Sequence, residues 1–411
     1  MSPFGITAET DDAATIGRLD SDSTARRWSI PEPSRFPLPA VGVMIYAGIR
    51  LLGLVMTVFL LRHGKFRQRG VSLGQWITGG DGGFYRAIAA HGYQYRPGQL
   101  AHAAVFAMFP GYPAAIDSLA WLTGVSIALA GFAVTILAGM AAAWGLVALG
   151  LKLTADPRIS LLMVAIWAVA PGSIALSRVY AEALFCALAV WTLVALLNRR
   201  WLTAGALVVL AGTVRSAALA LIAAVAVAVL TALIQAARTR QRIALWWRPV
   251  AALLLAPLGL LGYWAYVTLA THRLDGWFWI EKHVFHMSFD WGVSTARVIR
   301  DTFLDAPSAA GVLVVLAFLA ALGLTAWSLT ERVPLYLHAY TVVVALMAFT
   351  TSANWISSKP RFILPAVLLA LPMARLLAPL RTSVLVPLLV VLTVASTWFG
   401  LYLAIIAQWA P

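Results

Sequence analysis

The sequence predicts an all-α polytopic membrane protein, and two observations support that prediction. Of its 411 residues, 61% are hydrophobic and only 11% are charged, a composition outside the range of soluble globular domains. The mean hydropathy is +0.85, and apolar runs of roughly 20 residues, the length needed to cross the hydrocarbon core, recur along the chain. We therefore expect a bundle of membrane-spanning helices rather than two or three soluble domains.

The first 38 residues differ from the rest of the chain. They hold six of the sixteen acidic residues and many serines and threonines, and they contain no long apolar run. Such a composition is typical of disordered segments. We therefore expect residues 1–38 to be a disordered cytoplasmic tail, and residues 39–411 to form a single transmembrane domain.

Nine apolar runs each predict one transmembrane helix, and a tenth run predicts two. The nine are 39–61, 126–150, 159–177, 179–197, 249–270, 308–329, 336–353, 362–377 and 383–406. The tenth, 201–236, is too long for one helix and carries Arg215 near its middle. Because a charge there interrupts the apolar run, we expect two short helices that form a hairpin with its tip at membrane depth. The prediction is about 11 spans in all.

The distribution of basic residues predicts the orientation. Arg199 and Arg200 precede the hairpin and four arginines between 238 and 248 follow it, so this side is expected to be cytoplasmic. The opposite, extracytoplasmic side of the plasma membrane then carries three loops or polar segments, namely 62–125, 271–307 and 354–361. The six Lys and Arg residues of the first loop oppose this orientation, but a long loop is translocated despite its charge.

The net charge of +14 comes from 30 Lys and Arg against 16 Asp and Glu. In a membrane protein such an excess reflects topology signals and contacts with anionic lipids, so we expect membrane lipids as partners and no nucleic acid. The single cysteine, Cys186, lies in an apolar run, which excludes a disulfide framework and a cysteine metal cluster.

The most informative stretch is 79–93, in the first outer loop, where four glycines surround Asp81 before a short helical pattern. Glycine on both sides allows backbone to approach a ligand closely and leaves the carboxylate uncrowded. As an alternative, Asp81 could simply cap the helix that carries Tyr85 and Ile88. The run is not a phosphate-binding loop, because it lacks the Lys-Ser/Thr ending and a preceding strand.

These residues resemble a known family. The bacterial relatives of the PIG-V mannosyltransferases, membrane enzymes of the GT-C class, carry Trp-Asp-x-x-Trp-Tyr-x-x-Ile-Ala-x-x-Gly-Tyr in their first outer loop. This chain matches that pattern at six positions: Asp81, Tyr85, Ile88, Ala89, Gly92 and Tyr93. Gly80 and Phe84 stand where the family usually has tryptophan.

Further matches follow in the family's order. Residues 109–113 resemble its Phe-Pro-x-Tyr-Pro, 171–173 its Pro-x-Ser, and 180–185 its Tyr-x-Glu-Ser-Leu-Phe. Arg215 falls where the family has Arg-Pro-x-Gly, although the proline and glycine are missing here. Residues 359–365 resemble the late Ser-Arg-Tyr-x-Leu-Pro element.

The resemblance covers about residues 40–380 and implies a fold and an activity. The implied fold is a GT-C-like bundle with amphipathic helices in the first outer loop. The implied reaction moves mannose from a polyprenyl monophosphate to a glycolipid or lipoglycan hydroxyl with inversion. Apart from the resemblance, we expect a monomer that needs no cofactor or metal. Asp81 resembles the base that takes the proton of the acceptor hydroxyl, and one carboxylate is enough for that step.

The leaving group would be a lipid phosphate, so the site also needs cations, and the forked guanidinium of arginine can bind two oxygens at once. The candidate phosphate-binding residues are Arg50, Arg215, Lys359 and Arg361. The first two lie inside apolar runs, where a charge costs about 2.5 to 3.5 kcal/mol, and either could instead form a structural ion pair, for example with Glu182. The last two begin a span, where basic side chains often reach lipid headgroups.

Seven further side chains in the matching motifs and outer loops are candidates for substrate binding: Tyr85, Arg86, His102, Tyr112, Glu182, His283 and His286. His283 and His286 could hold a metal together with Glu281 if the loop is helical, because positions three apart share a helix face. Two imidazoles and one acid form a loose set, so we expect hydrogen bonds to sugar or phosphate instead. His102 has either the same role or a plain surface role.

A different functional class remains open at this point. Intramembrane arginines and a broken hairpin are also typical of transporters, so a carrier or flippase of lipid-linked sugars is the alternative function. The chain shows no internal repeat, and its unusual residues gather in the outer loops, which favours the enzyme.

Overall fold

The computed structural model describes residues 37–94, 103–239, 247–305 and 308–407. The prediction of a disordered tail over residues 1–38 falls almost entirely outside these ranges, as does His102. The described residues form helices, with no strand among them beyond one isolated bridge between Phe289 and Thr351. The prediction of an all-α protein is therefore confirmed.

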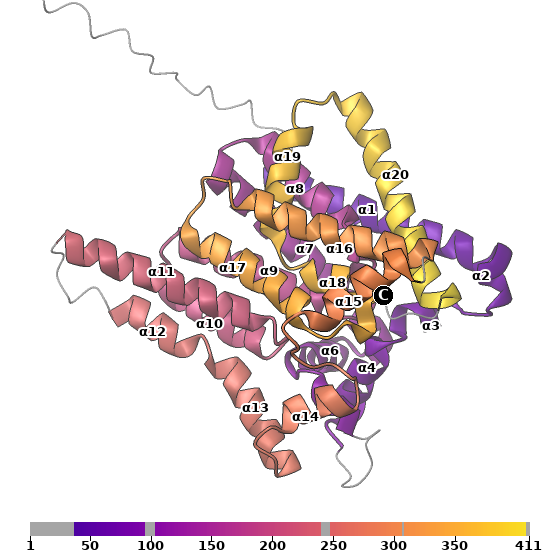
Figure 1. Cartoon of the computed structure of the whole chain (residues 1–411), viewed down its shortest axis with the longest axis horizontal. Helices are drawn as coiled ribbons and strands as arrows, with labels where there is room; N and C mark the ends of the chain where they lie inside the picture. The colour runs from indigo at the N-terminus through magenta and orange to yellow at the C-terminus, as the bar shows by residue number, and fades with distance from the viewer. Residues whose placement is uncertain (1–36, 95–102, 240–246, 306–307, 408–411) are drawn as a thin grey trace, which may run out of the picture. The chain divides into compact units, whose positions relative to one another are not determined.

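Long apolar helices form the framework (Figure 1). They are α1 (Leu38–Leu61), α7 (Ile127–Thr154), α11 (Ala218–Arg238), α16 (Ala309–Ser328) and α20 (Thr382–Leu401), together with the pair α12 (Trp247–Leu255) and α13 (Leu258–Thr271). By length and composition these give six candidate membrane spans. A seventh arises if α18 (Lys359–Ile363) and α19 (Ala370–Leu377), whose segments are bent by 80°, count as one.

Four shorter apolar helices occupy the remaining predicted segments. These are α8 (Pro157–Val169), α9 (Glu182–Leu197), α10 (Trp201–Gly212) and α17 (Leu335–Thr350). Every segment predicted as a span thus contains an apolar helix or helix pair, and the polytopic character is confirmed. The predicted span 159–177 is interrupted after α8, whereas the break that follows α10 is the one that the sequence predicts at Arg215.

Two of these breaks matter for the site. The predicted span 159–177 ends early, at Val169, because Pro171 lacks a backbone N–H and Gly172 adopts a positive φ of 83° before the short helix η2 (Ser173–Ser177). The predicted hairpin in 201–236 does break around Arg215, between α10 and α11. Its second helix, however, is 21 residues long rather than short.

The loop 62–125, predicted to be the first outer loop, is largely helical, as predicted. It contains α2 (Gly64–Gln68), α3 (Leu73–Thr78), α4 (Asp81–His91), η1 (Ala104–Ala107) and α6 (Gly111–Thr123). The second loop carries α14 (Gly276–His283) and α15 (Val293–Leu304), and the third carries η4 (Ala353–Ser358). Helices hydrogen-bond most of their own backbone, which suits loops that lie against apolar helices.

The core is centred on α9, whose residues from Glu182 to Leu196 are almost all buried. It packs against α7, α10 and α11, and α10 and α11 run side by side in Figure 1. Small residues permit the close approach: a Cβ added at Gly145 of α7 would lie 2.7 Å from a methyl of Val190 on α9. Close helix packing of this kind holds the N-terminus of α9 in a fixed place.

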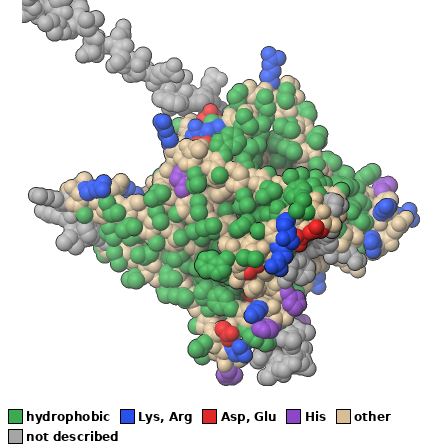
Figure 2. All heavy atoms as spheres, viewed as in Figure 1, with side chains coloured by type: hydrophobic (Ala, Val, Ile, Leu, Met, Phe, Trp, Pro, Cys, Tyr) green, Lys and Arg blue, Asp and Glu red, His purple; other side chains and the backbone are tan. Residues whose placement is uncertain are grey.

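The outer surface of the bundle is apolar. Figure 2 shows hydrophobic side chains over α11, α16 and α17, whereas most charged side chains lie towards the edges and the lower part of the view. Large apolar side chains such as Leu51, Leu254 and Leu269 are more than 60% exposed. In water such exposure is unfavourable, and it is the surface expected of a helix bundle solvated by lipid.

The structure brings the three predicted outer loops together. Phe84 of α4 lies edge-on to Phe285 of the second loop, with ring centroids 6.0 Å apart. The second loop contacts the segment just before the third loop through a hydrogen bond from the Ser352 N–H to the Ser288 carbonyl, 2.8 Å. The functional candidates of the three loops thus lie at one end of the bundle.

Candidate active site

Asp81 is the first residue of α4, and its carboxylate forms an ion pair rather than a helix cap. The residue at the cap position is Gly80, and no side chain caps the helix there. Oδ2 of Asp81 lies 3.0 Å from Nη1 of Arg361, and the Asp81 side chain remains 29% exposed. The alternative that Asp81 merely caps its helix is therefore wrong.

Glycine is required at position 80. Its φ of 60° lies in the region that L side chains avoid, and an added Cβ would lie 2.3 Å from the hydroxyl of Tyr180. The family that this sequence resembles usually has tryptophan at this position, and its side chain would not fit beside Tyr180 in this conformation. The glycine therefore places the start of α4 directly against the segment that precedes α9.

Asp81 is the end of a chain of alternating charges. Glu182, at the start of α9, has Oε1 3.2 Å from Nε of Arg361 and 2.6 Å from Nη1 of Arg215. The Glu182 side chain is 1% exposed, that of Arg361 9% and that of Arg215 18%. Two guanidiniums and two carboxylates thus balance one another, which a buried cluster needs in order to be tolerated.

The members of this cluster lie at helix ends, between helices or in a very short helix. Arg215 lies between α10 and α11, Glu182 begins α9, where the helix dipole favours a negative charge, and Arg361 lies in the short α18. Helix ends project polar side chains without requiring a continuous polar stripe inside an apolar helix. This explains how a charged site forms among helices that are otherwise apolar.

Two aromatic candidates lie beside the cluster. Tyr85 is buried, packs edge-on against Tyr112 at 5.0 Å, and interacts electrostatically with Arg215 and Asp81. Burial raises the pKa of Tyr85 well above its usual value, while Arg215 opposes the shift. Tyr112 is fully buried, and its hydroxyl donates to the Gly131 carbonyl at 3.0 Å, which fixes α6 on α7. Tyr85 therefore borders the site, whereas Tyr112 holds the fold.

Two of the four basic candidates lie elsewhere. Arg50 donates to the carbonyl oxygens of Ala168 and Ser173, near the end of α8. Lys359 is 1% exposed, and Nζ donates to the carbonyls of Ala348 at 2.6 Å and Thr351 at 2.7 Å. Both side chains satisfy carbonyls freed where a helix ends. The structure brings Arg215 and Arg361 to Asp81, and places Arg50 and Lys359 in these structural roles.

The remaining candidates have separate positions. Nδ1 of His283 lies 2.8 Å from the Trp279 carbonyl, and its ring stacks on that tryptophan. Helix α14 ends at His283, and His286 has a positive φ of 53°, so the two imidazoles do not share a helix face. Arg86 is partly exposed on α4. Within the described ranges no group of three or more His, Cys, Asp or Glu side chains is placed to hold a metal.

Two further side chains lie near Asp81: Glu281, which the sequence suggested only as a possible metal ligand, and Arg178, which sequence reasoning missed. Glu281 of α14 interacts electrostatically with Asp81 and Arg215, and burial raises its pKa to about 8. Arg178 precedes α9, is 5% exposed, and its guanidinium lies 4.5 Å from the centroid of the Tyr180 ring. The guanidinium of Arg361 lies 5.0 Å from the same ring. In the sequence Arg178 is a single charged residue between two apolar runs, and a charge at that position is also what an ordinary turn between two helices would carry.

The cluster can support proton transfer from a substrate. Asp81 is the most exposed of the four charges, and its partner Arg361 is held in turn by Glu182. A carboxylate whose oxygen is held by a fixed guanidinium is kept in one orientation, as positioning a general base requires.

The chain matches a family model and is similar to a solved structure. A family model described as Mannosyltransferase (PIG-V) matches residues 71–373 of the chain. No curated protein sequence matches. Among solved structures, ArnT from Cupriavidus metallidurans bound to undecaprenyl phosphate is similar at 14% sequence identity and a TM-score of 0.48, with 81% of this chain and 59% of that chain covered. The chain thus spans less than two thirds of the length of that neighbour.

Proposed function

Because this chain belongs to the PIG-V mannosyltransferase family, we propose that it moves mannose from a polyprenyl monophosphate to a hydroxyl of a glycolipid or lipoglycan. Asp81 is the general base. The anomeric carbon inverts, because a single displacement needs one base and no covalent intermediate. The site faces the extracytoplasmic side of the plasma membrane, and the N-terminus is cytoplasmic.

The observation that carries this proposal is the position of Asp81 in the charge cluster. It is the most exposed member, so an acceptor hydroxyl can reach it, while Arg361 holds one of its oxygens. As the hydroxyl oxygen attacks C1 of the sugar, the bond from C1 to the phosphate oxygen breaks. The hydroxyl proton passes to Asp81, and the polyprenyl phosphate leaves with the bonding electrons.

Several other candidates would bind the acceptor in this proposal. Arg86, His283 and His286 lie on or beside α4 and α14 and have exposed or partly exposed side chains. Such polar groups can hydrogen-bond sugar hydroxyls or anionic groups of a lipoglycan. Glu182 acts through its ion pairs, since it is buried behind Arg361.

The test is sugar transfer by the purified protein. It is incubated with polyprenyl-phosphate mannose, or the glucose or arabinose analogue, and a membrane lipid extract, and products are identified by mass. We expect a mannosylated lipid, and a loss of about 100-fold or more in kcat for Asp81→Asn, which keeps the shape but not the basicity. Asp301→Asn is the matched control, because Asp301 is an exposed acid paired with Arg300.

Two outcomes would overturn the proposal. One is the absence of product from every donor, and the other is full transfer by Asp81→Asn. If lipid-linked sugar instead crosses proteoliposome membranes without transfer, and does so equally in Asp81→Asn, the carrier function is favoured.

A further inference from the structure

The charge cluster at Asp81 leaves no spare cation for the donor phosphate. Arg361 and Arg215 are each paired with a carboxylate, and Arg50 and Lys359 are engaged with backbone carbonyls. A phosphate monoester brings additional negative charge that needs a cation or several donors in a low-dielectric site. The donor phosphate therefore calls for a basic group that no carboxylate pairs with and that also lines a cavity.

Arg178 meets this requirement. It is 5% exposed, Nε donates to the Trp76 carbonyl at 3.0 Å, and the guanidinium lies over the Tyr180 ring. Its Nη1 is buried without a hydrogen-bond partner among the described residues, and no acid of those ranges forms an ion pair with it. A buried arginine nitrogen left without an acceptor is costly unless a ligand supplies one.

Arg178 lines a pocket of about 380 Å³ that lies next to Asp81. Gly79 and Gly80, the two residues before Asp81, form part of its wall, and a second arginine, Arg69, lies on it. Ala404 and Ile405 of η6 (Tyr402–Ile406), the continuation of α20, also line it, and Nη2 of Arg69 donates to the carbonyl of Ile406 at 3.3 Å. The pocket thus combines the side chains of two arginines, the backbone of two glycines and the apolar side chains of Ala404 and Ile405.

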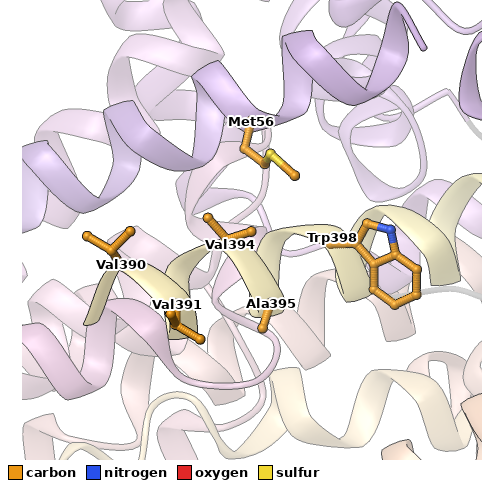
Figure 3. Close-up of a pocket in the computed structure, with 6 residues that line it drawn as sticks. All are labelled: Met56, Val390, Val391, Val394, Ala395 and Trp398. Carbon is orange, nitrogen blue, oxygen red and sulfur yellow. The ribbon is translucent and has the colours of Figure 1, made fainter. Parts of the chain in front are cut away.

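An apolar groove lies further along the same helix. It measures about 340 Å³ and is lined by Met56 of α1 and by five residues of α20: Val390, Val391, Val394, Ala395 and Trp398. Figure 3 shows Met56 and Val394 pointing towards one another across this groove. From Trp398 to Ala404 the chain advances about 9 Å at the rise of a helix. The cationic pocket and the groove therefore follow one another along one helix.

We propose that the pocket of Arg178 and Arg69 binds the phosphate of a polyisoprenyl monophosphate, and that the groove between α1 and α20 holds its hydrocarbon chain. This deepens the proposed function and rests on it for the identity of the donor. A sugar on that phosphate lies beside Gly80 and hence next to Asp81, the following residue. A polyisoprenyl monophosphate has one anionic group followed by an apolar chain, and the two cavities follow one another in the same order. Free phosphate would need only the cationic pocket and not the apolar groove.

Binding of undecaprenyl phosphate to the full-length protein in nanodiscs tests this without any transfer reaction. We expect Arg178→Gln and Arg69→Gln each to weaken binding about tenfold, as loss of a charged hydrogen bond does. Val394→Trp, which fills the groove, should weaken binding as much. The controls are Arg67→Gln on α2 and Val386→Trp, an exposed position of α20 outside the groove.

Competition separates the sources of the phosphate. Unlabelled undecaprenyl phosphate should displace the bound lipid, whereas undecaprenol, phosphatidylglycerol and inorganic phosphate should not. Equal binding by wild type, Arg69→Gln and Val394→Trp would overturn the proposal even if Arg178→Gln fails to fold. Displacement by phosphatidylglycerol at equal concentration would also overturn it, because the site would then be a general anionic-lipid site.

The result of the binding test does not depend on whether the protein transfers mannose. If mannose is transferred while the pocket and groove variants keep the wild-type KM for the donor, this site is wrong and the function stands. If undecaprenyl phosphate binds in an Arg178-dependent way but no sugar is transferred, the site stands and the function is wrong.

Discussion

Gly172 lies directly against the backbone of Arg361. Its φ is 83°, and an added Cβ would lie 2.7 Å from the backbone nitrogen of Arg361 and 2.8 Å from its Cα. The turn that ends α8 therefore sets the position of α18. Because the guanidinium of Arg361 joins Asp81 to Glu182, the contact at Gly172 also fixes the geometry of the charge cluster.

Gly172→Ala should therefore impair both stability and transfer. A positive φ costs a residue with a Cβ about 1 to 2 kcal/mol, and the backbone of Arg361 cannot move without displacing its guanidinium. We expect a lower midpoint of thermal unfolding in detergent and a loss of about tenfold or more in kcat. Gly323→Ala in α16 is the control, since nothing lies within 4 Å of a Cβ there. Unchanged kcat in Gly172→Ala would contradict this role.

The pair of Glu182 and Arg215 should show strong energetic coupling. Removing one partner leaves a buried charge without compensation, so Glu182→Gln should cost about 3 to 5 kcal/mol of unfolding free energy. The double variant Glu182→Gln/Arg215→Gln should lose less than the sum of the two single changes. The measurement is a double-mutant cycle by denaturant unfolding in mixed micelles.

The exposed pair of Arg300 and Asp301 provides the matched control. Its side chains are 63% and 39% exposed, although the atoms are 2.7 Å apart. Solvent screening should reduce its coupling to about 0 to 1 kcal/mol. A coupling of that small size at Glu182 and Arg215 would mean that the buried pair does not stabilise the fold.

The sequence was sufficient to predict where the helices lie and several of the residues that form the charge cluster. Apolar runs predict the helices, and a charged residue that interrupts such a run is visible in the sequence itself. Arg215 and Glu182 stood out as charges within or beside apolar segments. The partners of Lys359 and Arg361 could not be predicted, because residues two apart on a helix point in directions about 200° apart. One therefore meets the carbonyls of α17 and the other meets Asp81. The carbonyl partners of Arg50 lie more than 100 residues away in sequence and exist only because α8 ends early.

Lys359→Met should reduce stability rather than donor binding. The change leaves the carbonyls of Ala348 and Thr351 without their donor, at a cost of about 2 to 3 kcal/mol. We expect a lower midpoint of thermal unfolding and an unchanged KM for the donor in the folded fraction. Lys152→Met, at an exposed position near the end of α7, serves as the control. A large rise in donor KM would instead assign Lys359 to the phosphate.

Stability should fall as the pH rises because of Glu281. Burial raises the pKa of this side chain from its ordinary value of 4.5 to about 8. Between these two values the folded protein keeps a proton that the unfolded chain has lost, so unfolding becomes easier across this window. Below pH 4.5 the Glu281 carboxyl is protonated in both the folded and the unfolded protein, so no stability is lost through this residue. Thermal unfolding midpoints measured from about pH 5 to about pH 9 should therefore decline in the wild type.

Glu281→Gln should remove most of this decline, whereas Asp305→Asn, at an exposed acid of the same loop, should not. The neighbours of Glu281 give a sharper test, because Asp81 raises its pKa and Arg215 lowers it. Asp81→Asn should therefore lower the pKa of Glu281 in the folded protein and narrow the pH range over which stability declines. Arg215→Gln should raise that pKa and widen the range, because the negative charge of Asp81 is then less balanced. A midpoint that stays constant in the wild type would show that Glu281 ionises in the folded protein as it does in water.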